Sequence, residues 1–492
     1  MTITPVARSW TVRTALALAV VAGFLISVDS RGHAQAGRAF TTNFSLQEFA
    51  ARRARVYEAI GPQAVALIQG LPTVHSSAVF RQSNEFFYLS GVVAPQALLL
   101  MDGTSKQSTL YLPKQNASRA ATEGELLSSD DPVKTAATTG VDEVKPPEQL
   151  LADLQARTAA RTIYVPYAPT EGSSESPDGA RRRTADAAAD PWDGRVSREA
   201  HLRDLLKTRV PALEQNDLSP ILNEMRAIKS PAEIALITRA TKIGGEAILE
   251  AMRSTAPGLA EYEIDALAQF IFVRHGAQGE AYRDIVASGP AAMNAHHRAG
   301  DKIMTDGELV LMDYCPDLGY YRCDVTRQWP VNGKFSPAQR ELYGFYLGVY
   351  EAVLHAIKPQ LTAQQILQAA LPKMDAILAS TKFAKPIYEA AAKQFVERYR
   401  SSAARGGNLG HAVGMATHDF GGGSGAMRPG LVFTIEPEFR VPEEQIFIRL
   451  EDMIVITESG ATILSDFVPR SIAAVEKVVA EPGLLQQYGR IR

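Results

Sequence analysis

Apolar positions in the N-terminal half of the chain change from a helical spacing to short continuous runs. Residues 45–61 carry apolar side chains at helical spacing, which predicts a helix. Strand-like apolar runs follow at 64–70, 97–102, 108–113 and 162–167. Strands that alternate with helices predict an α/β domain in this half.

Residues 168–194 interrupt this pattern. They are rich in Pro, Gly, Ser, Ala and charged residues, and they have almost no apolar periodicity. Such a composition favours a surface segment over a packed element. We predict a solvated surface insertion or mobile loop without a function of its own.

Two short sequences in the C-terminal half are typical of helix starts. SPAE at 230–233 places Ser at the N-cap, Pro at the first helical position and Glu at the third, and SPAQ at 336–339 repeats this order. Between them, the apolar segment 307–331 predicts two strands around a turn. The runs at 430–439 and 446–457 predict further strands.

The N-terminus has the three parts of a secretory signal peptide. Arg8 and Arg13 precede a 15-residue apolar core at 14–28, and the small-residue sequence AQA follows at 34–36. A membrane anchor is the alternative, but a span needs about 20 apolar residues, and charged residues end this run earlier. We therefore predict that residues 1–36 are a cleaved signal peptide. The mature protein would be periplasmic or secreted, without stable membrane insertion.

Composition and length limit the other functional classes. The chain has 492 residues, of which 46% are hydrophobic, so it can bury a sizeable core in two or three domains. We place an N-terminal domain at 38–215 and a C-terminal domain at 216–492. With 51 basic and 54 acidic residues the net charge is -3, so the composition does not show the excess of basic residues that is typical of nucleic-acid-binding proteins. Two cysteines exclude a disulfide scaffold.

Two aspartates in apolar strand sequence flank the turn at Gly319. If Leu318 and Gly319 are the two central residues of that turn, Asp313 lies opposite Asp324 on the same face of the hairpin. Two adjacent carboxylates repel, and one is protonated unless a cation lies between them. Exposed loop acids are the alternative, which the apolar neighbours disfavour.

The same register also predicts whether the two cysteines can form a disulfide. It pairs Cys315 with Arg322 and Cys323 with Tyr314, so the two sulfur atoms point to opposite faces. Such a pair cannot form a disulfide without movement of the backbone. We therefore predict two free thiols.

Two further strand carboxylates, Glu436 and Glu451, extend the set of acids. Carboxylates are rarely buried without a partner. With His411 in the sequence GHAVG, four carboxylates and one imidazole suit two divalent cations. Oxygen-dominated ligation favours manganese over metals that prefer thiolate. A cation pair roughly 3.5–4 Å apart can activate a water molecule and polarise a carbonyl.

The segments that carry these residues resemble the five-ligand pattern of the pita-bread metallopeptidases. They are DYCPDLGYYRCDVTR, GHAVGMATHD, TIEPE and RLEDM. FRQSNEFFYLSG and LNEMRAIKSPAEI also resemble the aminopeptidase P and prolidase subgroup, which carries an additional N-terminal domain. The resemblance spans most of the mature chain apart from 168–194. It implies an N-terminal α/β domain followed by a C-terminal pita-bread catalytic domain.

The resemblance implies a role for each metal-ligand candidate. Asp313 would bind one metal with both oxygens, and Asp324 and Glu451 would bridge the two metals. His411 and Glu436 would complete the set of ligands around the second metal. Glu436 would also move a proton from the water to the leaving nitrogen.

It also implies roles for residues beside the metals. His418, seven residues after His411, would contact the scissile group and stabilise the oxyanion. His296 is at the position of a substrate-contacting histidine, with His297 as its rival. Arg449, two residues before a ligand on the same strand, would orient ligands or bind substrate.

The implied activity is that of a Xaa-Pro aminopeptidase, which acts on peptides with proline in second position. The alternatives are a Xaa-Pro dipeptidase (prolidase) and a non-catalytic pita-bread binding protein. The complete ligand set disfavours a metal-free hydrolase of the creatinase kind. We expect two divalent ions per chain, Mn²⁺ with Zn²⁺ or Co²⁺ as alternatives, and a homo-oligomer, either a dimer or a tetramer.

Two positions depart from the subgroup pattern. Gly407 stands where a second histidine usually precedes the metal histidine, and Glu438 stands where glycine is usual. We expect weak activity on short Xaa-Pro peptides, and a gain in activity from Gly407→His.

Overall fold

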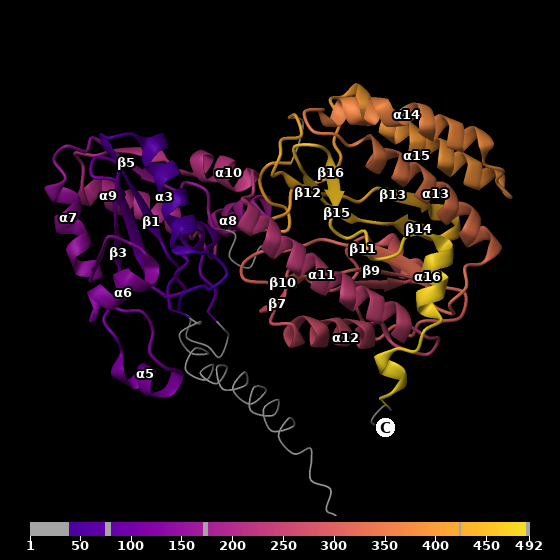
Figure 1. Ribbon diagram of the computed structural model, residues 1–492, viewed down its shortest axis with the longest axis horizontal. Helices are drawn as coiled ribbons and strands as arrows, with labels where there is room; N and C mark the ends of the chain where they lie inside the picture. The colour runs from indigo at the N-terminus through magenta and orange to yellow at the C-terminus, as the bar shows by residue number, and fades with distance from the viewer. Residues whose placement is uncertain (1–38, 74–79, 171–175, 423–424, 489–492) are drawn as a thin grey trace, which may run out of the picture.

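The computed structural model describes residues 39–73, 80–170, 176–422 and 425–488. The predicted signal peptide lies outside these residues. Two domains lie side by side, and α10 (Ser219–Ala227) leads from the first to the second (Figure 1).

The N-terminal domain is built on one six-stranded sheet with strand order β4-β3-β2-β1-β5-β6. Its central strand β1 pairs antiparallel with β2 and parallel with β5. The four predicted strands are β1, β2, β3 and β5, so the predicted α/β domain is confirmed. The strands are β1 (Ala64–Gln69), β2 (Leu98–Asp102), β3 (Gln107–Tyr111), β4 (Glu143–Lys145), β5 (Thr162–Val165) and β6 (Glu214–Asp217), the last of which crosses the predicted boundary at 215. The helices are α3 (Leu46–Ile60), α4 (Asn84–Ser90), α5 (Ala117–Glu123), α6 (Pro132–Thr139), α7 (Leu150–Ala156), α8 (Pro177–Ala189) and α9 (Arg198–Arg209).

Helix α8 corrects the prediction of an irregular loop at 168–194. Ser176 caps this helix through its side chain, and Pro177 occupies the first turn. The Ala- and Arg-rich sequence that follows has a high intrinsic helix propensity. A search for a wide apolar stripe misses such a helix, because its only buried residues are Pro177 and Ala180.

The C-terminal domain places its strands between two groups of helices. Figure 1 shows α11 and α12 on one side and α13, α14 and α15 on the other. The helices are α11 (Pro231–Ser254), α12 (Glu261–Arg274), α13 (Pro337–Ala356), α14 (Ala363–Ser380), α15 (Pro386–Ala404) and α16 (Ile472–Val479). The strands form the sheets β11-β9-β8, β12-β15-β16, β13-β14 and β10-β7. Their bounds are β7 (Gly279–Glu280), β8 (Ile285–Ser288), β9 (Leu309–Asp313), β10 (Pro316–Asp317), β11 (Thr326–Pro330), β12 (Val432–Ile435), β13 (Glu438–Val441), β14 (Ile446–Arg449), β15 (Asp452–Ile456) and β16 (Ala461–Ile463).

Both predicted helix starts in this domain are confirmed. Ser230 accepts a hydrogen bond from the Glu233 backbone at 3.3 Å, and the Glu233 carboxylate accepts one from the Ser230 backbone at 2.9 Å. Ser336 and Gln339 form the same reciprocal pair at the start of α13. Each box satisfies backbone donors that a helix N-terminus leaves free.

The turn of the metal-ligand hairpin differs from the prediction. Its central residues are Gly319 and Tyr320, both with positive φ, at 58° and 77°. Leu318 and Tyr321 exchange backbone hydrogen bonds of 2.9 and 3.1 Å across the turn. Positive φ at both central positions matches the type I′ hairpin turn, which suits the twist of the strands.

This register changes the partner of Asp313. The β9–β11 ladder pairs Asp313 with Thr326, so the predicted pairing with Asp324 is wrong. The two aspartates still meet, because the Tyr282 hydroxyl lies 2.7 Å from a carboxylate oxygen of each.

The prediction of free thiols is also wrong. Cys315 and Cys323 form a disulfide with their Cα atoms 5.6 Å apart. The hairpin strands stop pairing with each other beyond the Asp313–Thr326 pair, and β10 pairs with β7 instead. The regular alternation of faces therefore does not hold at the cysteines.

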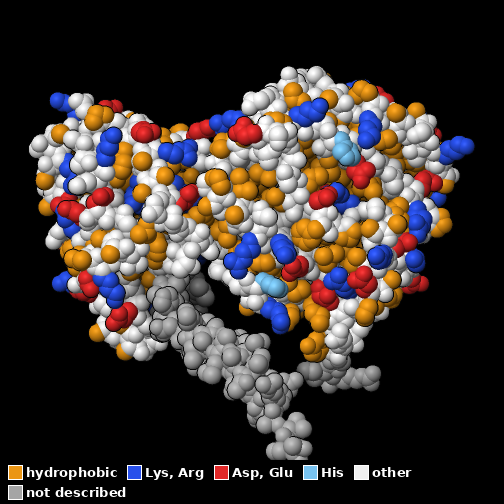
Figure 2. Space-filling view, in the orientation of Figure 1, with side chains coloured by type: hydrophobic (Ala, Val, Ile, Leu, Met, Phe, Trp, Pro, Cys, Tyr) orange, Lys and Arg blue, Asp and Glu red, His pale blue; other side chains and the backbone are white. Residues whose placement is uncertain are grey.

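Charged side chains of both signs are interspersed over both domains on the face that Figure 2 shows. Within the described residues, no helix is both long and apolar enough to cross a bilayer.

Candidate metal centre

The five predicted metal ligands lie at strand ends and in one loop of the C-terminal domain. Asp313 ends β9, Asp324 precedes β11, Glu436 follows β12, Glu451 precedes β15, and His411 lies in the loop between α15 and β12. The Glu451 backbone N–H donates to the Thr326 carbonyl at 3.1 Å, so the ends of the two sheets meet. Residues far apart in the sequence thus reach one place.

Distances show that the five side chains form one cluster. The Nε2 atom of His411 lies 3.6 Å from Asp324 Oδ2, 3.4 Å from Glu436 Oε1 and 4.0 Å from Glu451 Oε1. Asp324, His411 and Glu451 each offer a ligand atom within 4.8 Å of the others. Asp313 joins them through the hydroxyl that it shares with Asp324.

The cluster concentrates negative charge away from water. Asp313 and Asp324 are each 4% exposed, and Glu451 is fully buried. Burial and the neighbouring carboxylates raise the pKa of Glu451 to about 8 and raise the pKa of Asp324 well above its usual range. Without a cation the cluster therefore favours bound protons over a full set of negative charges.

The residues present fit divalent cations. The Nε2 atom of His411 faces three carboxylates and has no hydrogen-bond partner among the described residues. A buried polar atom without a partner is rare and calls for an explanation such as a missing ion. An oxygen-rich set with one imidazole is a donor set for divalent metals.

Arg449 is the buried cation of the site. Only 1% of this residue is exposed, and its guanidinium contacts Asp313 and lies 3.3 Å from Glu436 Oε2. Burial alone would raise the pKa of Glu436, but His411 and Arg449 outweigh this effect and lower it. Arg449 thus lies where it can orient two ligand carboxylates.

Hydroxyl groups that sequence reasoning missed hold the carboxylates in place. Thr326 and Thr434 donate to the two oxygens of Glu451, at 2.7 and 2.9 Å. Each threonine lies two residues from a predicted ligand on the same strand face, so the strand period could have revealed both. Tyr282 lies far in sequence from every ligand and carries no comparable signal.

The two histidines seven residues apart are neighbours in space. The rings of His411 and His418 stack with centroids 3.7 Å apart and planes 10° from parallel. The Asp419 backbone donates to the Ala412 carbonyl at 2.8 Å, which folds the intervening loop back on itself. The protein packed around the ring and the neighbouring His411 lower the pKa of His418 to about 4. His418 is therefore neutral at pH 7.

The rival histidines 296 and 297 face different surroundings. His297 Nε2 lies 2.8 Å from the buried carboxylate of Glu261 on α12. His296 is exposed, and it lies close enough to His418 to contribute to the lowered pKa of that ring. Asp178 at the start of α8 acts on the same ring, so this helix also lies near the site.

The N-terminal domain helps to hold the histidine loop. Asp419 forms a 2.8 Å ion pair with Arg226 of α10, and both side chains are 1% exposed. Arg226 also lies 2.9 Å from Glu85 of α4. The Asn84 amide donates to the Met415 carbonyl at 3.2 Å. The loop beside the metal centre is thus anchored across the domain boundary.

Comparisons with known proteins agree with this site. The model of metallopeptidase family M24 matches residues 235–458, and that of the aminopeptidase P N-terminal domain matches residues 49–164. A Xaa-Pro aminopeptidase of Haemophilus influenzae is 30% identical over 463 residues, which cover 90% of this chain and 99% of that protein. The chain belongs to metallopeptidase family M24.

Other M24 proteins extend the likeness. The Xaa-Pro aminopeptidase of Escherichia coli is 29% identical, with 89% of this chain and 98% of that protein covered. The structure of aminopeptidase P from E. coli with the inhibitor Pro-Leu has a TM-score of 0.69 at 26% identity, covering 89% of this chain and 98% of that one. As an M24 member of the aminopeptidase P type, the protein is a metallopeptidase that binds divalent cations.

The two departures from the family pattern lie beside the M24 site. Gly407 has φ of 79°, and a Cβ atom there would lie 2.5 Å from the Gln364 backbone nitrogen at the start of α14. Glu438 begins β13 and accepts a hydrogen bond from Arg440 at 2.8 Å. A histidine at position 407 cannot be added without moving backbone, so the expected gain from Gly407→His gives way to an expected loss.

We expect Tyr282→Phe to weaken Mn²⁺ binding about tenfold, as removal of a group that orients metal ligands commonly does. The change keeps the ring and removes the hydroxyl that contacts Asp313 and Asp324. Titration calorimetry measures the dissociation constant. Tyr343→Phe is the control, because that buried hydroxyl donates to the Arg470 carbonyl. Equal affinity in both variants would remove Tyr282 from the site.

We expect Gly407→Ala and Gly407→His to destabilise the fold by ~1–3 kcal/mol, the usual cost of overpacking. Gly406→Ala is a matched control, because Gly406 also has positive φ, at 103°, but has no atom within 4 Å of an added Cβ. Thermal unfolding followed by circular dichroism compares the variants. A smaller loss at position 407 than at position 406 would contradict the steric argument.

Proposed function

We propose that this protein is a Xaa-Pro aminopeptidase, a metal-dependent exopeptidase that releases the N-terminal residue before a proline. One observation carries the proposal. Four carboxylates and His411 converge beside His418, in a chain about 30% identical to Xaa-Pro aminopeptidases over most of its length.

The proposed ligand roles are those that the family pattern implies for the five clustered side chains. Asp313 would hold one cation, Asp324 and Glu451 would be shared by two cations, and His411 and Glu436 would complete the coordination of the second cation. We favour Mn²⁺, because oxygen donors dominate the set, with Zn²⁺ and Co²⁺ as alternatives.

Bound cations would polarise the scissile carbonyl and lower the pKa of a water molecule. Glu436 is the most exposed of the four carboxylates, with 29% of its side chain accessible. Its lowered pKa keeps it ionised. Glu436 can therefore take a proton from the attacking water and deliver it to the leaving proline nitrogen.

The histidines act on the substrate. Neutral His418 can donate an N–H hydrogen bond to the carbonyl oxygen as negative charge develops there. Exposed His296 contacts the substrate from the same side. Arg449 orients Asp313 and Glu436, because its buried guanidinium has little surface to offer a peptide.

Proline in second position is a reason for a dedicated enzyme. A Xaa-Pro bond has no N–H, and proline restricts the preceding residue. Peptidases that bind an extended backbone through its N–H groups therefore handle this bond poorly.

Export and oligomerisation are part of the same proposal. The apolar N-terminal segment supports export, and so does the disulfide, because disulfides persist mainly in oxidising compartments. Cell fractionation and light scattering would measure the compartment and the number of subunits.

We expect the Mn²⁺-loaded protein to cleave peptides with proline second and to leave matched peptides with alanine second uncut. A series from Xaa-Pro dipeptides to hexapeptides, followed by chromatography, measures the preferred length. Cleavage of dipeptides alone would indicate a Xaa-Pro dipeptidase. No cleavage at any length by fully loaded protein would favour the non-catalytic binding protein.

We expect His418→Ala to lower kcat roughly a hundredfold, the scale of one oxyanion donor, with metal content unchanged. His411→Ala should instead lose metal, because its imidazole faces three ligand carboxylates. Kinetics and elemental analysis of both variants test this. Metal loss in His418→Ala but not in His411→Ala would show that the roles are reversed.

A further inference from the structure

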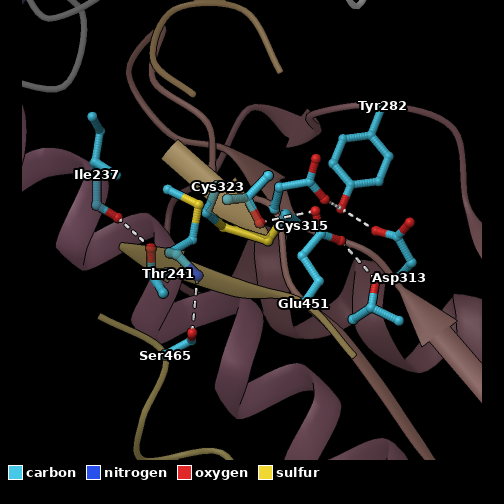
Figure 3. Close-up of a disulfide and its surroundings, with 12 residues drawn as sticks. Ile237, Thr241, Tyr282, Asp313, Cys315, Cys323, Glu451 and Ser465 are labelled. Carbon is cyan, nitrogen blue, oxygen red and sulfur yellow. Dashed lines mark hydrogen bonds between the residues drawn. A yellow bond between two sulfur atoms is a disulfide. The ribbon is translucent and has the colours of Figure 1, made fainter. Parts of the chain in front are cut away.

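We propose that the Cys315–Cys323 disulfide is a clasp that positions Asp313 and Asp324 for metal binding. Cys315 lies two residues after one aspartate, and Cys323 directly precedes the other. Figure 3 shows the disulfide in the same region as Glu451, Asp313 and Tyr282. The inference rests on the ligand roles proposed above and adds a covalent element that the ligand set itself does not contain.

The clasp lies where the hairpin lacks its own pairing. Within the described part of the hairpin, strand pairing joins Asp313 to Thr326, and the next pair is Leu318 with Tyr321 at the turn. Between these two pairs, backbone groups of the hairpin form hydrogen bonds with residues outside it. The Cys315 carbonyl accepts from Ala281, and the Arg322 N–H donates to Gly414 in the histidine loop.

A covalent link replaces the missing pairing at this position. Ladder hydrogen bonds normally fix the separation and register of two antiparallel strands. Here Asp313 lies at the edge of an opened section of the hairpin, and Asp324 lies within it. The disulfide fixes the distance between the strands there, with the two Cα atoms 5.6 Å apart.

The helix that packs on the disulfide leaves space for it. An added Cβ at Gly244, inside α11, would lie 2.9 Å from Cys315 Sγ and 3.2 Å from Cys323 Sγ. Glycine inside a helix is destabilising relative to alanine, so its presence at this contact calls for a packing reason. Both cysteines are fully buried under this helix. The disulfide is therefore part of the packed core against which the ligand hairpin is held.

Reduction of the disulfide by a dithiol should weaken metal binding. The reductant supplies two electrons and two protons, the S–S bond breaks, two S–H groups form, and the reductant becomes a disulfide. The hairpin strands can then separate beside both aspartates. We expect the dissociation constant for Mn²⁺ to rise about tenfold, the lower end of the effect of positioning groups around metal ligands.

The first experiment compares the wild type with the Cys315→Ser/Cys323→Ser double variant. Titration calorimetry gives the Mn²⁺ dissociation constant, and circular dichroism reports the fold. The expected result is binding about tenfold weaker, with kcat restored at saturating Mn²⁺. Excess metal rescues a positioning defect, whereas it does not rescue a misfolded site. Equal affinity in the two proteins overturns the clasp.

The second experiment needs no variant. Linkage is reciprocal, so a disulfide that tightens Mn²⁺ binding tenfold is itself stabilised tenfold by saturating Mn²⁺. Equilibration of wild-type protein in glutathione redox buffers, with and without Mn²⁺, measures the ratio of disulfide to dithiol. A ratio that Mn²⁺ leaves unchanged overturns the clasp.

Neither binding measurement depends on peptide cleavage. If Mn²⁺ shifts the disulfide ratio but no Xaa-Pro peptide is cut, the clasp stands and the proposed activity fails. If peptides are cut and Mn²⁺ leaves the ratio unchanged, the activity stands and the clasp fails.

Discussion

The burial of four carboxylates in one place is the constraint on which the rest of the structure depends. Asp313, Asp324 and Glu451 are almost completely enclosed, and the only basic side chains that contact this group among the described residues are Arg449 and His411. Such a group folds only with protons or cations to balance its charge. The raised pKa values of Asp324 and Glu451 reflect the free-energy cost of burying their negative charges together.

The fold holds the buried carboxylates in place with hydroxyl groups that donate hydrogen bonds to them. Glu451 accepts two threonine hydroxyls, and Tyr282 contacts two aspartates at once. The two threonines lie in β11 and β12, whose backbone pairing fixes their positions, and Tyr282 lies in the short segment between β7 and β8. The site therefore resists rearrangement when its charge changes, and a preorganised set of ligands needs little movement to bind a cation.

Sequence reasoning succeeded where the signal is local. The capping boxes at Ser230 and Ser336 and the apolar strands depend on neighbouring residues alone, and the structure has them as predicted. The five ligand candidates meet because four lie at strand ends that come together and His411 lies in a loop beside them. Their motifs indicated this meeting, but no pattern of spacing could establish it.

The wrong pairing of Asp313 arose where a single backbone torsion decides the outcome. The turn uses Tyr320 with positive φ beside Gly319, and residues other than glycine, asparagine and aspartate rarely adopt that conformation. The predicted turn was therefore centred one residue too early. This shift of the turn explains the wrong pairing of Asp313. The wrong state of the cysteines has a separate cause, because the observed register would also put them on opposite faces, and the disulfide forms where the two strands no longer pair.

The histidine loop shows why a distant domain is part of this metal site. A buried ion pair such as Arg226–Asp419 costs desolvation that its attraction only partly offsets, so its stabilising effect alone does not explain it. The geometry of the pair explains its presence. Asp419 also accepts a hydrogen bond from the Met415 backbone at 3.0 Å, and Arg226 also pairs with Glu85 in the N-terminal domain. The loop that carries His411 and His418 is thereby fixed at its far end. The spacing of seven residues, which suits no helix face, places both rings side by side because the backbone hydrogen bond from Asp419 to Ala412 folds the loop between them back on itself.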